Sequence, residues 1–238
     1  MTGGVTLVGG GWDGDPAAWA AFAAEAAARA GGRVPRVLLV AVRDGDAADH
    51  AERLAAEVRA AAPVEPLVVA LRHGDRLDPD AVPGDVDGVL VGGGLTPEYA
   101  AALAPAAARL RALVAAGAPY AGFSAGAAIA ARRALVGGWR RLGRPVLDEE
   151  VAEDRDELTV VDGIGLVPFS VDVHAAQWGT TSRLMTAVEA GLVGTGVAID
   201  EATAVVVAPG ATRVVGRGSA WWVDRAPGGV LVRREGGA

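Results

Sequence analysis

Residues 118–133 contain the pattern that most directly suggests chemistry, a serine between small residues. Gly122, Ser124 and Gly126 form G-x-S-x-G, which is typical of a nucleophile elbow, a sharp turn from a strand into a helix. Because this turn crowds the residues two before and two after the serine, both must be glycine or nearly as small. The hydroxyl then lies above the sheet, where helix N–H groups can stabilise a developing negative charge. We expect Ser124 to be a nucleophile for acyl transfer, although a chain with 34 glycines can also produce this spacing by chance.

A serine nucleophile requires a base, and the sequence offers three histidines. His174 is favoured because it follows a short apolar segment and precedes a predicted helix. His50 lies in the middle of a predicted helix and is expected to be an exposed surface residue. His73 lies in a predicted loop and is a weaker candidate.

The base in turn usually needs a carboxylate that orients it. Asp200 and Glu201 lie between two apolar, strand-like runs, and Asp172 precedes His174 by two positions. We favour Glu201 as the orienting acid and expect Asp200 to be structural, while Asp172 stays open as an alternative.

Backbone N–H groups are expected to stabilise the oxyanion of an acyl-transfer reaction. Ala125 directly follows the predicted nucleophile, so its N–H is one candidate. Gly93 and Gly94 follow another predicted strand, where the missing side chains would let the backbone approach a substrate. A tight turn without any ligand is the simpler alternative for these glycines.

Alternating strands and helices are expected to position these residues. Each predicted strand is a continuous apolar run, which is typical of a parallel sheet covered on both faces. The predicted strands are 5–8, 36–42, 64–71, 86–91 and 119–123. The predicted helices are 16–30, 46–62 and 97–116. The helix over 16–30 is expected to be capped by Asp13 or Asp15 and ended by Gly31 and Gly32. The site is therefore expected at the carboxyl ends of the strands, together with the glycines at 9–11.

After residue 133 the sequence no longer shows a regular alternation of apolar strands and helices. We expect a solvated polar loop over 135–157, a strand and turn within 158–167, an extended piece at 170–174, a helix over 180–191 and an antiparallel meander over 195–232. The fold class predicted is α/β, a three-layer α/β/α sandwich with a mainly parallel sheet and an antiparallel C-terminal extension. We interpret residues 1–238 as a single domain of this kind.

The composition narrows the function classes. The net charge of −7 argues against a nucleic-acid partner, and the absence of cysteine excludes disulfides and thiolate chemistry. The uncharged run 112–131 contains Pro119 and several glycines, so we read it as buried strand and helix ends, with no membrane partner. A cytoplasmic location is expected, because no targeting segment is recognisable. The sequence implies no metal or cofactor. Whether the protein forms a homodimer is left open.

Several segments, taken in order, resemble the dipeptidase E and cyanophycinase family of serine peptidases. They are LVGGG at 7–11, VGGG at 91–94, GFSAG at 122–126, VDVHAAQWGTTSRL at 171–184 and GVAIDEATAVVV at 196–207. The resemblance implies a class I glutamine amidotransferase-like fold and a small peptide substrate. It also implies that Ser124 is the nucleophile, His174 the base and Glu201 the acid, with Gly93, Gly94 and Ala125 in the oxyanion region.

The segment after His174 departs from the family pattern. Ala175 stands in place of an aromatic residue, and Trp178 and Thr180 occupy positions where arginines are common. Such arginines would suit an acidic substrate group, so their absence weakens the expectation of acidic specificity and leaves the triad unaffected. Arg183 is retained and is expected either to bind a substrate carboxylate or to form a structural ion pair. Trp178 is expected to make the substrate pocket more apolar.

Other functions are compatible with parts of the sequence. An α/β-hydrolase esterase also uses G-x-S-x-G, but its acid would have to lie between Glu149 and Asp172, before the histidine. Gly9, Gly11 and Gly14 match the G-x-G-x-x-G pattern of dinucleotide-binding proteins, although neighbouring aspartates would repel a pyrophosphate. A non-catalytic binding member of the same fold is the third alternative.

Overall fold

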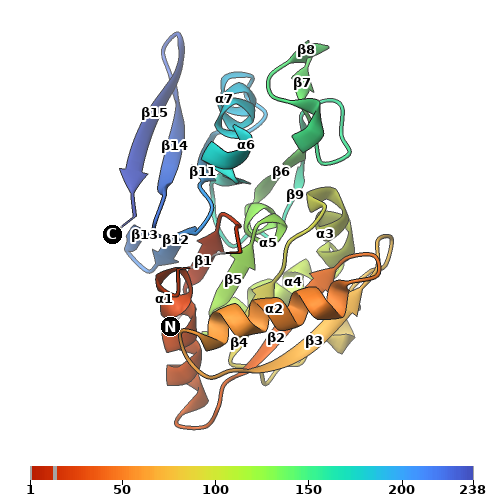
Figure 1. The fold of residues 1–238 in the computed structure, drawn as a ribbon, viewed down its shortest axis with the longest axis vertical. Helices are drawn as coiled ribbons and strands as arrows, with labels where there is room; N and C mark the ends of the chain where they lie inside the picture. The colour runs from red at the N-terminus through yellow and green to blue at the C-terminus, as the bar shows by residue number, and fades with distance from the viewer. Residues whose placement is uncertain (1, 13–14, 238) are drawn as a thin grey trace.

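A computed structural model describes residues 2–12 and 15–237, and in this part of the chain a seven-stranded sheet forms the centre of the fold (Figure 1). Its strands, in spatial order, are β13 (Ala211–Gly216), β12 (Thr203–Ala208), β1 (Val5–Val8), β5 (Tyr120–Phe123), β4 (Gly88–Val91), β2 (Arg36–Val42) and β3 (Glu65–Leu71). The strands β1, β5, β4, β2 and β3 run parallel to one another. At the edge beside β1, β12 pairs with β1 and β13 pairs with β12, both in antiparallel fashion. The predicted α/β class with a mainly parallel sheet and antiparallel C-terminal strands is confirmed.

The alternation of side chains along β2 explains the layers. Leu38, Val40 and Val42 belong to one hydrophobic core, and the intervening Leu39 and Ala41 belong to the other. Because successive side chains of a strand point to opposite faces, an apolar run of this kind is stable only when helices cover both faces.

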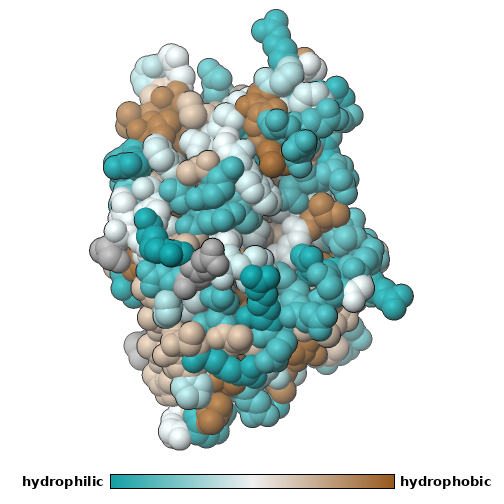
Figure 2. Space-filling view, in the orientation of Figure 1, coloured by the Kyte–Doolittle hydropathy of each residue, from teal (hydrophilic) through white to brown (hydrophobic). Residues whose placement is uncertain are grey.

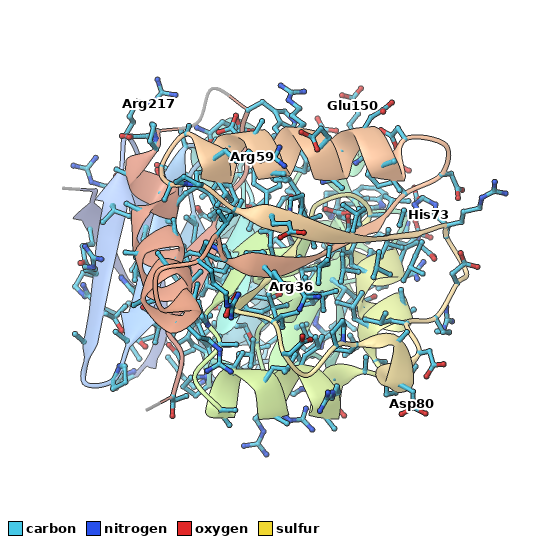
Figure 3. The ribbon with its side chains drawn as sticks, turned by 90° about the horizontal axis from the view of Figure 1, so that it is seen from below. Arg36, Arg59, His73, Asp80, Glu150 and Arg217 are labelled. Atoms are coloured by element: carbon cyan, nitrogen blue, oxygen red, sulfur yellow. The ribbon has the colours of Figure 1, made fainter. Side chains whose placement is uncertain are left out.

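Helices from different parts of the chain fill the two outer layers. On one face lie α1 (Ala17–Ala30) and α2 (Ala47–Arg59), and on the other lie α3 (Thr96–Leu103), α4 (Ala107–Ala115) and α5 (Ala125–Ile129). Figure 3 shows helices on both sides of β2 and β3, with α2 identified by Arg59 and β2 by Arg36. A short 3-10 turn, Pro79–Ala81, precedes β4.

Local sequence signals set the helix ends. The backbone N–H of Ala17 donates to Asp15 Oδ1 at 2.9 Å, and α1 ends at Gly31, whose φ of 62° lies in the left-handed region. Asp13, the other predicted cap, and Gly14 lie outside the described residues. The single helix predicted over 97–116 is wrong, because the chain forms α3 and α4 with a break that contains Pro105, which has no N–H to donate.

A second sheet carries most of the C-terminal part. Its strands, in spatial order, are β10 (Ser170–Val173), β11 (Thr195–Ile199), β14 (Ser219–Ala226) and β15 (Gly229–Gly236), and it packs against α6 (Ala175–Trp178) and α7 (Thr181–Glu189). The meander predicted over 195–232 is therefore divided, since β12 and β13 extend the central sheet and β11, β14 and β15 form the second one. The strand β11 pairs in parallel with β10 and therefore belongs to the second sheet and not to the central one.

The segment expected to be a polar loop contains regular structure. It holds β6 (Arg133–Gly137), β7 (Arg140–Arg141), β8 (Arg144–Pro145) and the 3-10 turn Glu149–Val151, and β6 pairs with β9 (Thr159–Asp162) in antiparallel fashion. The prediction of a loop over 135–157 was wrong at β6, because Leu135 and Val136 are buried there by long-range pairing.

Hydrophobic residues on the face drawn in Figure 2 form separate patches among hydrophilic residues. The large hydrophobic side chains that stay exposed in the described part are Val34, Val68, Leu142, Trp178 and Leu231. No helix in the described ranges has the length and apolar character needed to cross a bilayer. The interpretation of residues 1–238 as one domain stays a prediction.

Two glycines make the turn between β5 and α5 sterically possible. A Cβ atom on Gly122 would overlap the carbonyl of Gly126, and a Cβ atom on Gly126 would overlap the carbonyl of Val91. These overlaps involve backbone atoms, which cannot rotate away as a side chain can. The G-x-S-x-G spacing of residues 122–126 thus has the steric cause expected from the sequence.

Replacement of Gly126 by alanine tests this cause. We expect Gly126→Ala to lower the free energy of unfolding by about 2–4 kcal/mol, because the added methyl group must displace backbone of β4. Urea unfolding followed by circular dichroism measures the change. Gly194→Ala is the control, since a Cβ atom there meets no atom within 4 Å, and equal stability of the two variants would contradict the explanation.

Candidate active site

Ser124 occupies the turn between β5 and α5 in a backbone conformation that is rare for a residue with a side chain. Its φ is 51° and its ψ is −112°, and its N–H donates to the carbonyl of Val8 at 2.9 Å. Residues held in such sparsely populated regions store strain and cluster at functional sites. The structure therefore has the geometry of a nucleophile elbow at the predicted serine.

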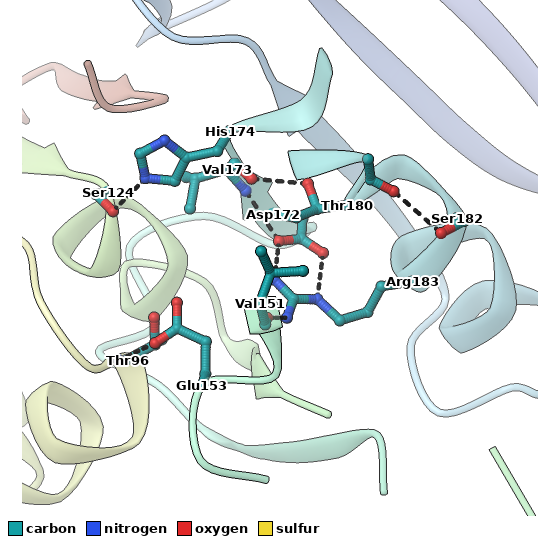
Figure 4. Close-up of polar contacts among 11 residues, drawn as sticks. Thr96, Ser124, Val151, Glu153, Asp172, Val173, His174, Thr180, Ser182 and Arg183 are labelled. Atoms are coloured by element: carbon teal, nitrogen blue, oxygen red, sulfur yellow. Dashed lines mark hydrogen bonds and ion pairs between the residues drawn. The ribbon is translucent and has the colours of Figure 1, made fainter. Parts of the chain in front are cut away.

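A chain of short hydrogen bonds links Ser124 to His174 and Glu201. Ser124 Oγ lies 2.9 Å from His174 Nε2 (Figure 4), and His174 Nδ1 lies 2.7 Å from Glu201 Oε1. A carboxylate can only accept, so Nδ1 carries the proton and Nε2 is left to accept from the serine hydroxyl. This arrangement can withdraw the hydroxyl proton as the oxygen attacks an electrophile.

The glycine-rich loop after β1 holds the imidazole in place. The His174 N–H donates to the carbonyl of Gly9 at 3.0 Å, and the Ala202 N–H donates to the carbonyl of Gly10 at 2.9 Å. A Cβ atom on Gly10 would overlap the His174 ring, and Gly10 has a φ of 102°. The sequence placed residues 9–11 at this edge of the sheet but did not indicate that they pack against the base.

Burial decides the protonation state of the imidazole. His174 is only 7% exposed, and this burial lowers its pKa below the ordinary value of a histidine. The hydrogen bond and charge of Glu201 act in the opposite direction but are outweighed. A neutral imidazole, ready to accept a proton, is therefore the resting form at neutral pH.

The other two candidate acids have structural partners. Asp200 accepts hydrogen bonds from the N–H of Ala176 at 3.0 Å, the N–H of Ser219 at 2.9 Å and Trp221 Nε1 at 3.1 Å. It therefore joins the turn after β11 to α6 and β14, in agreement with the structural role expected for it.

Asp172 forms a buried ion pair with Arg183 (Figure 4). Arg183 Nε and Nη2 donate to the two carboxylate oxygens of Asp172 at 2.9 and 2.6 Å, and Nη1 donates to the carbonyl of Val151 at 3.2 Å. The Arg183 side chain is only 3% exposed and does not line the cavity at Ser124. Of the two roles considered for Arg183, the geometry favours the structural ion pair over contact with a substrate carboxylate.

Trp178 stacks on the catalytic candidate His174. The two ring centroids are 3.8 Å apart with an interplanar angle of 13°, and Trp178 is 39% exposed. It lines the cavity, as expected for a substrate-binding residue, but the stacking could not be foreseen from the residue pattern. Because α6 follows His174 directly, the indole covers one face of the imidazole.

The loop after β4 presents Gly93 and Gly94 to the cavity, but their two N–H groups differ. Gly93 N–H donates to His50 Nε2 at 3.0 Å, so it is already engaged. Within the described residues, the N–H groups of Gly94 and of Ala125, which opens α5, have no hydrogen-bond partner. Free N–H groups at the start of a helix and beside a nucleophile suit an oxyanion.

The expectation that His50 is an exposed surface residue is wrong. His50 is 7% exposed, and burial lowers its pKa to about 4. The helix α2 turns this residue toward the sheet on the same side as Leu54 and Val58, and its ring packs edge-on against Trp12. Leu54 and Val58, which follow His50 at helical spacing, were the sequence signal that this residue is buried. His73, by contrast, lies beside Asp44 with its side chain 30% exposed.

Ser124, His174, Glu201, Trp178 and Gly94 line a cavity of about 1070 Å³. One wall is the segment 149–156, whose Glu149, Glu150 and Asp154 are exposed. Glu153 accepts from the Thr96 N–H at 2.9 Å and so attaches this segment to the start of α3, and burial raises the Glu153 pKa. The acidic segment was expected to be a solvated face, and its position at the cavity could not be seen in the sequence.

A family model described as peptidase family S51 matches residues 73–215, which include Ser124, His174 and Glu201. The chain belongs to peptidase family S51. As an S51 member it is a serine-type peptidase, and the resemblance seen in the sequence is confirmed. No curated protein sequence matches the chain.

Two solved structures share the fold of this S51 peptidase. A crystal structure of a peptidase from an acI-B1 Actinobacterium matches with a TM-score of 0.70 at 17% identity, covering 100% of this chain and 96% of that one. The structure of a putative peptidase E protein from Listeria monocytogenes EGD-e matches with a TM-score of 0.57 at 16% identity, covering 91% and 99%. At these identities the similarity establishes the fold.

The role of Arg183 can be tested by stability. We expect Arg183→Met to lower the free energy of unfolding by about 3–5 kcal/mol, because it leaves the Asp172 carboxylate buried without its partner. Arg133→Met is the control, since the Arg133–Asp162 pair is exposed and such pairs contribute little. An Arg183→Met variant with wild-type stability and a raised KM would instead support contact with substrate.

Proposed function

We propose that this S51 peptidase hydrolyses short peptides, as a dipeptidase or related exopeptidase, through a triad of Ser124, His174 and Glu201. The observation that carries the proposal is the continuous hydrogen-bonded chain from Ser124 Oγ through the imidazole to the Glu201 carboxylate. A strained serine, a neutral buried base and an orienting acid are the parts that nucleophilic acyl transfer requires.

The reaction follows from this chain of groups. Ser124 Oγ attacks the scissile carbonyl carbon while His174 Nε2 accepts the hydroxyl proton, and Glu201 stabilises the resulting imidazolium. The carbonyl oxygen becomes an oxyanion that the N–H groups of Gly94 and Ala125 stabilise. His174 then gives its proton to the leaving amine, and a water molecule, deprotonated by the same imidazole, hydrolyses the acyl-enzyme.

The size of the cavity supports a small peptide substrate. A volume of about 1070 Å³ lies slightly above the range of about 300–1,000 Å³ that is typical of small-molecule sites. Walls formed by Trp178 and by the segment 149–156 bound the space beside Ser124, so a short peptide fits this space better than a long extended chain.

The esterase and the non-catalytic alternative differ from this proposal in specific residues. An esterase of the α/β-hydrolase type would take its acid from Glu149 to Asp172, but His174 Nδ1 is hydrogen-bonded to Glu201, which lies outside that range. A non-catalytic binding protein would need no aligned base, yet His174 Nε2 lies 2.9 Å from the serine hydroxyl. The hydrogen-bond geometry thus favours the peptidase over both.

Removal of the nucleophile tests the proposal directly. We expect Ser124→Ala to lower kcat on a panel of dipeptides by about 10⁴- to 10⁶-fold, as loss of a triad member does elsewhere. A fluorophosphonate probe should label the wild type at Ser124 and leave the variant unlabelled, as mass spectrometry of the tryptic peptides would show.

Ser182→Ala is the matched control, because Ser182 donates to the Val146 carbonyl and does not line the cavity. It should keep wild-type kcat and labelling. Unchanged hydrolysis by Ser124→Ala would disprove the triad, and a wild type that takes up no probe would favour the non-catalytic alternative.

The charge of the cavity wall leads to a second expectation. Glu149, Glu150 and Asp154 are exposed on it beside one exposed arginine, Arg155, so acidic groups outnumber basic ones there. Arg183 is occupied by Asp172. We expect peptides with acidic side chains to have a kcat/KM about 2- to 5-fold below that of neutral or basic analogues, the size expected of partly exposed charge pairs. The difference should shrink as salt is added.

Initial rates on peptides that differ only in the charge of one side chain measure this preference. Glu150→Gln should narrow the difference, whereas Glu65→Gln should not, because Glu65 is exposed at the amino end of β3 and does not line the cavity. A preference for acidic peptides that rises at low salt would contradict the expectation.

A further inference from the structure

The loop between β4 and α3 is held by side chains that do not belong to the triad. Gly93 N–H donates to His50 Nε2 at 3.0 Å, and the Gly93 carbonyl accepts from Tyr99 Oη at 3.0 Å and from Arg43 Nη1 at 3.1 Å. These side chains come from α2, from α3 and from the residue after β2. Both polar groups of Gly93 are therefore fixed from separate elements.

We propose that His50, together with Tyr99 and Arg43, is a positioning residue that orients the Gly93–Gly94 peptide so that Gly94 N–H is the oxyanion donor of this loop. This inference rests on the proposed function of Ser124. It assigns the donor to one of two adjacent glycines and gives a role in catalysis to residues outside the triad.

The geometry of a peptide bond connects these contacts to the oxyanion. In a trans peptide the C=O and N–H groups point in opposite directions, so a carbonyl fixed at Gly93 also fixes the N–H of Gly94. The Gly93 carbonyl is directed toward Tyr99 and Arg43, and the Gly94 N–H is directed away from them. Gly93 itself lies against the nucleophile, since a Cβ atom built on it would be 2.9 Å from Ser124 Cβ.

His50 is suited to accept a hydrogen bond because it stays neutral. A backbone N–H can only donate, so Nε2 must carry a lone pair, which a protonated ring would lack. Burial lowers the His50 pKa to about 4, with Arg43 and Arg53 acting in the same direction and Asp46 in the opposite one. The imidazole is therefore an acceptor throughout the neutral range.

The surroundings leave His50 little freedom to move. Its ring meets Trp12 edge-on at 5.2 Å and Phe123 at 6.2 Å between centroids. Arg43 is held by two hydrogen bonds of 2.8 Å to Asp46, and Tyr99 is fully buried. A preorganised donor stabilises the transition state without the cost of reorientation during the reaction.

A pair of substitutions at His50 separates positioning from packing. We expect His50→Leu to lower kcat by about 10- to 100-fold, less than the about 10²–10³-fold that loss of an oxyanion donor costs, with KM nearly unchanged. His50→Gln places an amide oxygen within reach of Gly93 N–H and should recover most of the loss. A wild-type kcat in His50→Leu would overturn the proposal.

Tyr99→Phe removes only the hydroxyl that binds the Gly93 carbonyl and keeps the buried ring. It should lower kcat in the same way, and its melting temperature shows whether the fold is intact, so the test survives if His50→Leu does not fold. His73→Leu is the control, because His73 lies outside the cavity and should leave kcat unchanged.

A readout independent of activity distinguishes this inference from the proposed function. With glycine-selective ¹⁵N labelling, the Gly93 amide resonance should shift in His50→Leu and return toward the wild-type position in His50→Gln. A resonance that does not respond would overturn the assigned contact. If Ser124→Ala proved fully active, the proposed function would fail, while the Gly93 resonance would still report on the hydrogen bond.

Discussion

The packing of Gly10 against the His174 imidazole is the contact on which the rest of the site depends. Ser124 ends a strand of the central sheet, whereas His174 and Glu201 follow β10 and β11 of the second sheet. The two sheets meet at residues 9–11, where Gly9 accepts a backbone hydrogen bond from His174 and Gly10 accepts one from Ala202, the residue after Glu201. The absence of a side chain at position 10 permits this approach. The backbone of residues 9–11 thus sets the distance between the Ser124 hydroxyl and the His174 imidazole.

The parts of the site that could be predicted are those with local causes. The elbow at Ser124 could be read from its flanking glycines, because steric crowding within a few residues of the chain dictates them. The parallel strands could be read from continuous apolar runs. His174 and Glu201 were found through the chemistry that a serine requires and through a family pattern, and the hydrogen bonds between them confirm that they meet.

The parts that could not be predicted depend on long-range contacts. His50 was expected at the surface although Leu54 and Val58 follow it at helical spacing, and its hydrogen-bond partner in the loop after β4 lies 43 residues away in the chain. The strand β6 was hidden in a polar segment because its partner β9 begins only at Thr159. Thr180, which stands where an arginine is common, is fully buried and donates to the Val173 carbonyl at 2.7 Å.

The segment 149–156 has one further consequence for this protein. It lies between β6 and β9, and hydrogen bonds join it to the residues that follow β6. Outside this excursion it is held by the contact of Glu153 with Thr96 and of the Val151 carbonyl with Arg183. Neither contact includes Ser124, His174 or Glu201. Substitutions in this segment can therefore alter which peptides enter the cavity without displacing Ser124, His174 or Glu201.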